Sequence, residues 1–141
     1  MFGLKLLLIF LSVASLAKSF AVIDPAHGKV LYHKEFVFVT WNDEGTDQSD
    51  HVNVELWKYE PADNDSTSPV YVALLGSSIS VGQGRAGLYV YPEYGLGDQF
   101  FIIIRTEVSQ IETRGDVFSI QTEQVVLKRS LKRSRTVRSL S

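Results

Sequence analysis

The chain has 141 residues, enough for one domain of ordinary size, and 45% of its residues are hydrophobic. It has no cysteine, which excludes a disulfide scaffold and leaves core packing to hold the fold. Its formal charge is −2, but the charges are unevenly distributed along the chain. Residues 20–127 carry 16 acidic and 6 basic side chains, whereas residues 128–141 carry 6 basic and none acidic. The acidic part argues against nucleic-acid binding by the domain, because it repels phosphate backbones.

Residues 1–19 have the pattern of a secretion signal. Lys5 supplies a positive charge, residues 4–17 form a short apolar stretch, and small side chains follow at Ala17 and Ser19. The apolar stretch is shorter than the about 20 residues that a transmembrane helix needs. We therefore expect a secreted chain without a transmembrane anchor, from which a signal peptide of residues 1–19 is removed.

Short runs of β-branched and aromatic residues recur between turn signals from residue 20 to residue 126. The pattern predicts strands at residues 21–23, 36–41, 52–59, 70–75, 88–91, 99–106 and 116–120. Residues 100–104 are apolar on both faces, which predicts a central strand, and residues 76–87 are predicted to be a flexible connection. We expect residues 20–126 to form an all-β domain, an immunoglobulin-like antiparallel β-sandwich of about seven strands.

Alternation along the strands predicts which side chains face the core. In the strand at 36–41, two valines and Trp41 share the core face, which leaves Phe36 and Phe38 on the opposite face. In the next strand, Trp57 lies opposite the aliphatic side chains. Aromatic residues exposed in this way can stack on sugar rings or join a protein partner. They form a candidate polysaccharide or partner surface, unless a loop or a neighbouring strand covers them.

Motifs for catalysis and metal binding are weak. Residues 82–87 match G-x-G-x-x-G, but a predicted strand follows them where a nucleotide site needs a helix. Residues 76–80 lack the second glycine and the helix of a serine-hydrolase elbow. Four acids between Asp43 and Asp50 could converge on calcium, and chance carboxylate pairs could give a weak hydrolase. We expect no enzymatic activity, no cofactor and no metal site, with these two readings as alternatives.

Two polar segments carry candidate modification sites. Asn64, followed by Asp65 and Ser66, forms an N-glycosylation sequon in a loop with two prolines. Residues 127–141 are expected to be a disordered basic tail.

That tail contains a tandem Leu-Lys-Arg-Ser repeat. Its dibasic pairs, Lys128 with Arg129 and Lys132 with Arg133, are possible processing sites, because proteases reach unfolded segments easily. The alternative is a tail that docks electrostatically on anionic wall polymer, on lipid or on the acidic domain of the same chain.

Several features from residue 22 to residue 120 occur in a recognisable order. They are Pro25, Gly28, Val30, Leu31, Val37, Val39, Trp41 and Gly45, and then residues 52–56, 89–92, 97–102 and 118–120. This ordered set resembles the Kre/Knh-like domain of fungal cell-wall synthesis proteins, which also occurs in Ser/Thr-rich, GPI-anchored fungal surface proteins. The resemblance implies an immunoglobulin-like fold and an extracellular, non-enzymatic role in wall assembly linked to β-1,6-glucan.

The chain departs from the family pattern in several places. The usual turn glycine before the second strand is Lys34, so this turn must either avoid positive φ or bear strain. The usual outward threonines on that strand are Phe36 and Phe38. The Ser/Thr-rich stalk, the GPI signal and the cysteine-bearing second domain of larger members are missing.

Together, these observations predict a secreted glycoprotein at the fungal cell surface or in the cell wall, with a role in cell-wall biogenesis. We expect it to be non-enzymatic and to contact wall polysaccharide (β-glucan) or wall protein. The alternative is a secreted precursor or effector-like protein whose tail is cut at the two dibasic pairs.

Overall fold

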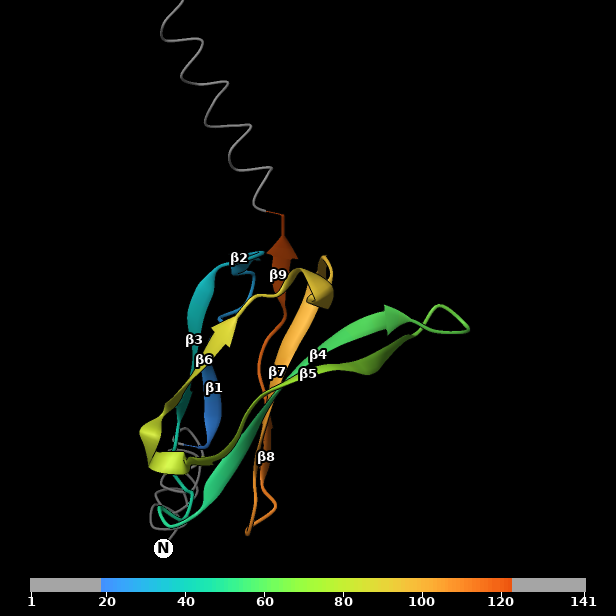
Figure 1. Cartoon of the computed structure of the whole chain (residues 1–141). Helices are drawn as coiled ribbons and strands as arrows, with labels where there is room; N and C mark the ends of the chain where they lie inside the picture. Colours follow the sequence, from blue (N-terminus) through green and yellow to red (C-terminus); the bar gives the residue numbers. More distant parts are fainter. Residues whose placement is uncertain (1–18, 123–141) are drawn as a thin grey trace, which may run out of the picture.

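A computed structural model describes residues 19–122, so residues 1–18 of the expected signal segment and the tail with its dibasic pairs lie outside this range. Figure 1 shows strands throughout, joined by turns and two short 3-10 helices. The elements are β1 (Ala21–Asp24), β2 (Val30–Tyr32), β3 (Phe36–Asn42), β4 (His51–Pro61), β5 (Thr67–Ser80), η1 (Val81–Gln83), β6 (Arg85–Tyr89), η2 (Pro92–Tyr94), β7 (Gly97–Thr106), β8 (Glu112–Arg114) and β9 (Phe118–Gln121). No helix within these residues is long and apolar enough to cross a membrane.

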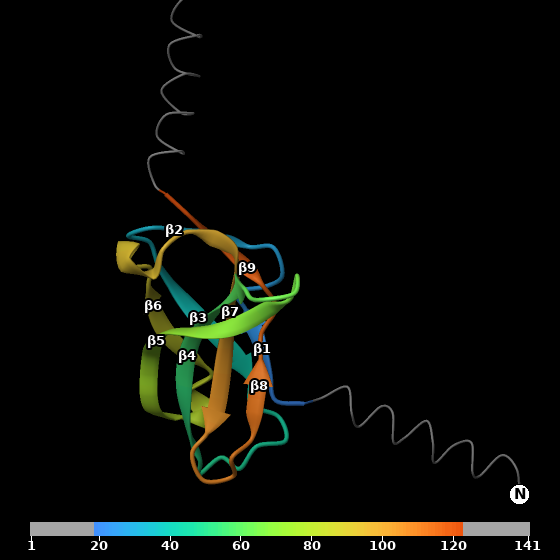
Figure 2. The ribbon, with the colours of Figure 1, turned by 90° about the vertical axis from the view of Figure 1, so that its right-hand side faces the viewer.

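The strands form two sheets that pack face to face, as Figures 1 and 2 show. The smaller sheet has the order β1-β3-β6, and the larger has the order β2-β9-β7-β4-β5, with β8 also paired to β7. All pairs are antiparallel except β2 with β9. This arrangement matches the A-B-E and G-F-C-C′ sheets of immunoglobulin domains, with the first strand divided between the two sheets. The predicted all-β sandwich is therefore confirmed.

All seven predicted strands are present, and the structure adds β2 and β8, each three residues long. The predicted flexible connection at residues 76–87 is wrong. β5 continues to Ser80, η1 follows at once, and β6 begins at Arg85. The segment is ordered because Ile79 packs against the core and Val81 is fully buried, so two apolar side chains anchor an otherwise Ser/Gly-rich stretch.

β7 lies at the centre of the larger sheet, as its apolar pattern predicted. β4 pairs with one of its edges, and β8 and β9 pair with the other. Its inward side chains, such as Phe100 and Ile102, join the core between the sheets. Phe101 points outward yet is also buried, since the ring of Tyr59 stacks on it at 4.4 Å and the Arg114 guanidinium lies 5.0 Å from its centroid.

Trp41 closes one end of the core. Its indole Nε1–H donates a hydrogen bond of 2.9 Å to the carbonyl of Val81, and its backbone N–H donates to the carbonyl of Gly84. Val81 in turn donates its N–H to the carbonyl of Asp50. These bonds fix the crossing from β5 to β6, where the chain passes from the larger sheet to the smaller one.

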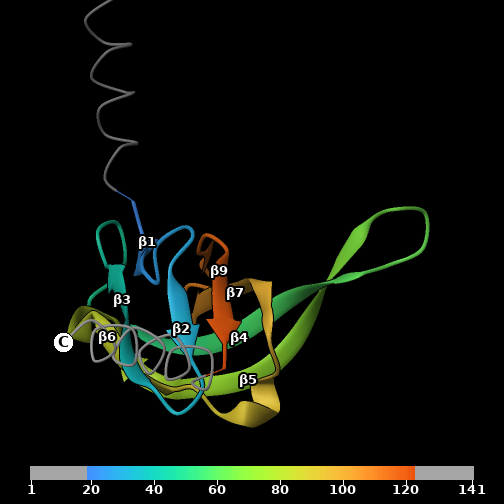
Figure 3. The same ribbon diagram turned by 90° about the horizontal axis from the view of Figure 1, so that it is seen from above.

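β4 and β5 extend beyond the rest of their sheet as a protruding arm, visible in Figures 1 and 3. Pairing of β4 with β7 ends at Lys58, opposite Phe100, whereas pairing of β4 with β5 continues to Pro61, opposite Thr67. We call this two-stranded projection, residues 59–69, the arm.

The turn before β3 is held in a strained conformation. Lys34 has φ of 68°, in the left-handed region that costs an L-residue about 1–2 kcal/mol. Its N–H nonetheless donates a 2.7 Å hydrogen bond to the carbonyl of Val90, and Val90 donates back to the carbonyl of Glu35. The two bonds hold the turn against the end of β6. Of the two alternatives that the sequence left for Lys34, the turn therefore has a positive φ and bears the strain.

Replacing Trp41 by Phe should destabilise the domain by about 2 kcal/mol, because it removes one buried hydrogen bond and part of a buried ring. Urea unfolding followed by circular dichroism measures this loss. The matched control is Trp57→Phe, because the only hydrogen bond of the Trp57 indole N–H among the described residues is a long one, 3.4 Å to the Glu55 carboxylate. Equal losses for the two variants would show that Trp41 has no special place in the core.

Replacing Lys34 by Gly should stabilise the domain by about 0.5–1 kcal/mol, since relief of left-handed strain exceeds the added entropy of the unfolded chain. The reverse control is Gly28→Ala, at φ of 75° with open space around the site, which should be destabilising by about 1 kcal/mol. Both values follow from chemical denaturation midpoints. A stability loss for Lys34→Gly would contradict the strain assignment.

Candidate functional site

The outer face of the smaller sheet exposes aromatic side chains. Phe36 and Phe38 on β3 are 58% and 43% exposed, and their rings meet edge to face with centroids 5.3 Å apart. Gly87 on β6 lies beneath the Phe36 ring, where an added Cβ would come within 2.9 Å of the ring. The Arg85 guanidinium lies 4.8 Å from the centroid of Phe38. The two rings are therefore fixed by their neighbours on both strands.

More aromatic side chains continue this surface along β6 and into η2. Tyr89 is the cross-strand partner of Phe36, and its ring lies 4.7 Å from that of Tyr91. Tyr91 in turn contacts Tyr94 at 5.6 Å. We call these five residues, Phe36, Phe38, Tyr89, Tyr91 and Tyr94, the aromatic band.

Tyr94 forms the inner end of the aromatic band. Burial raises the pKa of its hydroxyl above the ordinary value, and the nearby Tyr91, Glu93 and Tyr71 raise it further. Its ring also packs against the core. Tyr94 is thus the anchored end of the band, whereas Phe36, Tyr89 and Tyr91 are exposed.

Trp57 does not lie with Phe36 and Phe38. It belongs to β4 on the outer face of the larger sheet, where it meets Tyr71 edge to face at 5.6 Å. The structure therefore divides the three predicted surface aromatics between the two outer faces of the sandwich. Alternation in the sequence shows that a side chain points away from the core, but it does not show which sheet carries it.

Charged side chains on the outer face of the larger sheet are paired among themselves. Arg105 contacts Glu55 at 2.6 Å and Glu112 at 3.5 Å. Arg114 donates a 3.0 Å hydrogen bond to the hydroxyl of Tyr59. These contacts join β4, β7 and β8, so the two arginines of this face are already paired.

The acidic side chains of the loop between β3 and β4 do not gather at one point in the described residues. Within residues 19–122 no three His, Cys, Asp or Glu side chains are placed to hold a metal ion. Asp43 accepts a hydrogen bond from Gln48, and Asp47 accepts two from Ser49. Two of the four acids that the calcium reading required, Asp43 and Asp47, are thus hydrogen-bonded within the loop.

Asp50 has a structural role that the sequence did not indicate. It is almost completely buried, and its carboxylate accepts hydrogen bonds from the backbone N–H groups of Val108 at 3.0 Å, Ser109 at 2.9 Å and His51 at 2.8 Å. The Ser109 hydroxyl donates a fourth bond. These donors, with the Val108 and Ser109 N–H groups foremost, hold the pKa of Asp50 well below its ordinary value. Because Val108 and Ser109 are 58 and 59 residues away, no local motif could have revealed this role.

The two motif-like segments do not form the sites that they would need. Residues 82–87 lie in η1 and β6, so the segment has no helix behind it to bind a phosphate. Residues 76–80 lie inside β5, where the Ser78 hydroxyl donates to Glu107 at 2.6 Å. A serine hydrolase also needs a histidine base on its nucleophile, and the hydroxyl of Ser78 is occupied by a carboxylate instead.

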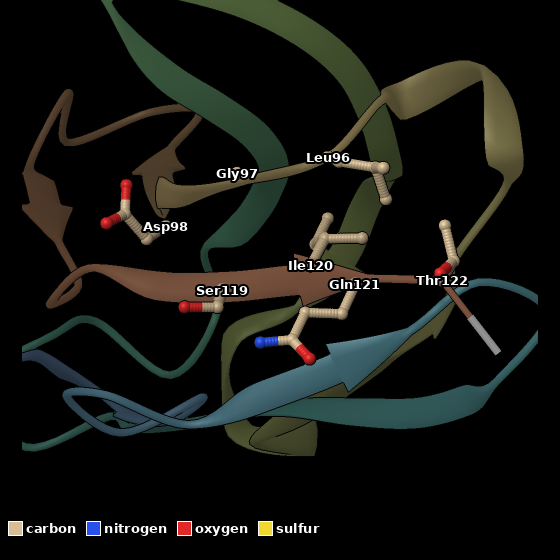
Figure 4. A pocket seen from close by; sticks show the side chains of 7 residues that line it. All are labelled: Leu96, Gly97, Asp98, Ser119, Ile120, Gln121 and Thr122. Carbon is tan, nitrogen blue, oxygen red and sulfur yellow. The ribbon is translucent and has the colours of Figure 1, made fainter. Parts of the chain in front are cut away.

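An open depression of about 380 Å³ lies between the start of β7 and β9, as Figure 4 shows. Its lining residues are Leu96, Gly97, Asp98, Ser119, Ile120, Gln121 and Thr122. Asp98 is the one titratable side chain among them, so the hollow lacks the pair of carboxyl groups that glycoside hydrolysis requires. The aromatic band is therefore the better candidate site.

Comparisons with known proteins add little about function. No protein-family model matches the chain, and no curated protein matches it either. A solved structure of an uncharacterized protein from Bacillus anthracis str. Ames is similar, at 17% sequence identity and a TM-score of 0.44. The match covers 72% of this chain and 83% of that chain, and a likeness this distant carries no argument about function.

The stability of the domain should fall as the pH drops below about 4, the ordinary range for a carboxyl group in an unfolded chain. The pKa of Asp50 is lower in the folded protein, so its contribution is complete above that range and is lost as the pH falls toward the folded value. Urea midpoints between neutral and acidic pH measure the slope. Asp50→Asn should be less stable at neutral pH and should show a shallower acid dependence, and an unchanged slope would contradict this role.

Proposed function

We propose that this chain is a secreted, non-enzymatic module of the fungal cell surface or wall that holds neutral wall polysaccharide. The proposal rests chiefly on one observation, the aromatic band on the outer face of the smaller sheet. Its rings contact one another in pairs along the chain, Phe36 with Phe38 and Tyr89 with Tyr91, and all four of these side chains are exposed. Exposed apolar groups gathered in this way are typical of binding surfaces. The role agrees with the one implied by the Kre/Knh-like resemblance.

The chemistry of the band suits a sugar polymer. The C–H faces of β-linked pyranose rings pack against aromatic rings, and tyrosine hydroxyls can bond the sugar hydroxyls at the rim. Tyr89 and Tyr91 supply such hydroxyls beside the purely apolar rings of Phe36 and Phe38. Arg85 adds a donor next to Phe38. The band thus combines stacking surface with a polar margin.

The charge of the domain favours an uncharged ligand. Residues 20–127 carry 16 acidic and 6 basic side chains, which disfavours approach of an anionic polymer. A neutral glucan faces no such repulsion, so its binding should depend little on salt concentration. The charge therefore favours the neutral wall polymers as a class, and the resemblance selects β-glucan among them.

Replacing both Phe36 and Phe38 by Ala should weaken binding to insoluble or immobilised β-glucan about tenfold or more, since loss of a well-placed aromatic contact costs about 1 kcal/mol or more. Both side chains are exposed, so the unfolding midpoint should move little. Affinity electrophoresis in glucan-containing gels or a pull-down measures the change.

Two controls sharpen this experiment. Val108→Ala removes an apolar side chain that is 83% exposed but lies outside the band, and Trp57→Ala removes an aromatic residue from the opposite face. Both variants should bind as the wild type does. Loss of binding in Trp57→Ala alone would move the site to the larger sheet, and absence of binding by the wild type to glucan, chitin and mannan would end the proposal.

A further inference from the structure

The tip of the arm presents Asn64 to solvent. The chain turns there between β4 and β5, with Asn64 and Asp65 at φ of 65° and 57°. The N–H of Ala62 donates to the carbonyl of Ser66 at 2.8 Å and closes the turn. Asn64 and Ser66, the two defining residues of the sequon, are both exposed. Figures 1 and 3 show the arm projecting away from the two packed sheets.

Neither residue of the sequon is needed to hold the fold. Among the side-chain hydrogen bonds of residues 19–122, that of Ser66 is the exposed local bond from its hydroxyl to the carbonyl of Asp63, and the Asn64 amide makes none. An oligosaccharide on the Asn64 amide would therefore meet solvent and displace nothing. The arm also separates this tip from the aromatic band on the smaller sheet, so a glycan here leaves the proposed binding surface open.

The arm has a second property that a glycan would offset. β5 is the edge strand of the larger sheet, and none of its 14 residues is charged. Native proteins commonly protect exposed strand edges with charged side chains, proline or bulges, because a free edge can pair with another chain. Here Tyr71 and Leu74 are exposed on the strand, and bulges interrupt its pairing with β4 only between Val52 and Trp57.

Proline protects one point of this edge. In an antiparallel hairpin, hydrogen-bonded residue pairs alternate with pairs that are not hydrogen-bonded. Ala62 and Ser66 form a hydrogen-bonded pair. Counting along the register, Tyr59 and Pro69, three pairs further on, are therefore a pair without hydrogen bonds. Pro69 therefore faces the outer edge, where it offers no N–H. By the same alternation, Thr67 and Tyr71 on either side turn their N–H groups outward, which leaves them available to a second copy of the arm.

We propose that Asn64 carries an N-linked oligosaccharide, and that this glycan keeps the uncharged edge of β5 from pairing with a second copy of the chain. The donor is a lipid-linked oligosaccharide pyrophosphate of the secretory pathway. A C–N bond forms between the anomeric carbon of the sugar and the Asn64 Nδ2, the bond from that carbon to the pyrophosphate oxygen breaks, the lipid pyrophosphate leaves, and the amide proton passes to a base. The inference requires export, which is part of the proposed function, but not polysaccharide binding.

The test is expression of the full chain in a eukaryotic host whose secretory pathway glycosylates asparagine. Material from the medium should lose the mass of one oligosaccharide on treatment with peptide N-glycosidase, with Asn64 converted to Asp. Ser66→Ala should abolish the glycan, Ser66→Thr should retain it, and Ser68→Ala, two residues beyond the sequon on β5, should leave it unchanged. Secreted chain without glycan at Asn64 would overturn the assignment, and a chain kept in the cytosol would overturn export as well.

Self-association tests the role of the glycan. Analytical ultracentrifugation should find the glycosylated chain monomeric and the Ser66→Ala chain partly dimeric at the same concentration, because only the latter has an uncovered arm. Restoring charge at the edge with Tyr71→Lys in the Ser66→Ala background should return the monomer. A Ser66→Ala chain that stays monomeric at every concentration at which the wild type is soluble would overturn the shielding role.

Discussion

The hydrogen bond from the Trp41 indole to the carbonyl of Val81 joins the two sheets at the point where the chain crosses between them. Val81 also donates its N–H to the carbonyl of Asp50, and the carboxylate of Asp50 binds the backbone of Val108 and Ser109. Three residues thus connect β3, the β5 to β6 crossing, the start of β4 and the loop after β7. In a chain without cysteine, this buried polar network supplies the cross-linking that a disulfide often gives small secreted domains.

The two outer faces of the sandwich differ in the side chains that they expose. On the larger sheet, Arg105 and Arg114 bind neighbouring carboxylate and hydroxyl groups, and Phe101 is covered. On the smaller sheet, the register of β3 against β6 places Phe36 over Gly87 and beside Tyr89. The aromatic band therefore depends on pairing between strands about 50 residues apart, and a side chain at Gly87 would displace its most exposed ring.

The arm helps to bury Phe101 at its base, but it also leaves a strand edge without a neighbour. Its base belongs to the larger sheet, where Tyr59 stacks on Phe101 and helps to bury it. No strand neighbours the arm on the β7 side beyond Lys58. Only features of the hairpin itself can therefore keep its edge from pairing with another chain. A proline at the edge and bulges near the base are two such devices on one hairpin, and the glycan that we propose at Asn64 is a third.

The amino-acid sequence predicts the features that depend on alternation with period two. It placed the seven longer strands, put Trp41 inside and Phe36 and Phe38 outside, and indicated that β7 is central, because each of these follows from which way successive side chains point. It missed β2 and β8, since three residues are too few for a pattern. Three features are seen only in the folded chain: Trp57 lies on the other face from Phe36, residues 76–80 are strand, and Asp50 binds a loop 58 residues away. Strand pairing and buried polar contacts join distant parts of the chain, and no local pattern records which parts will meet.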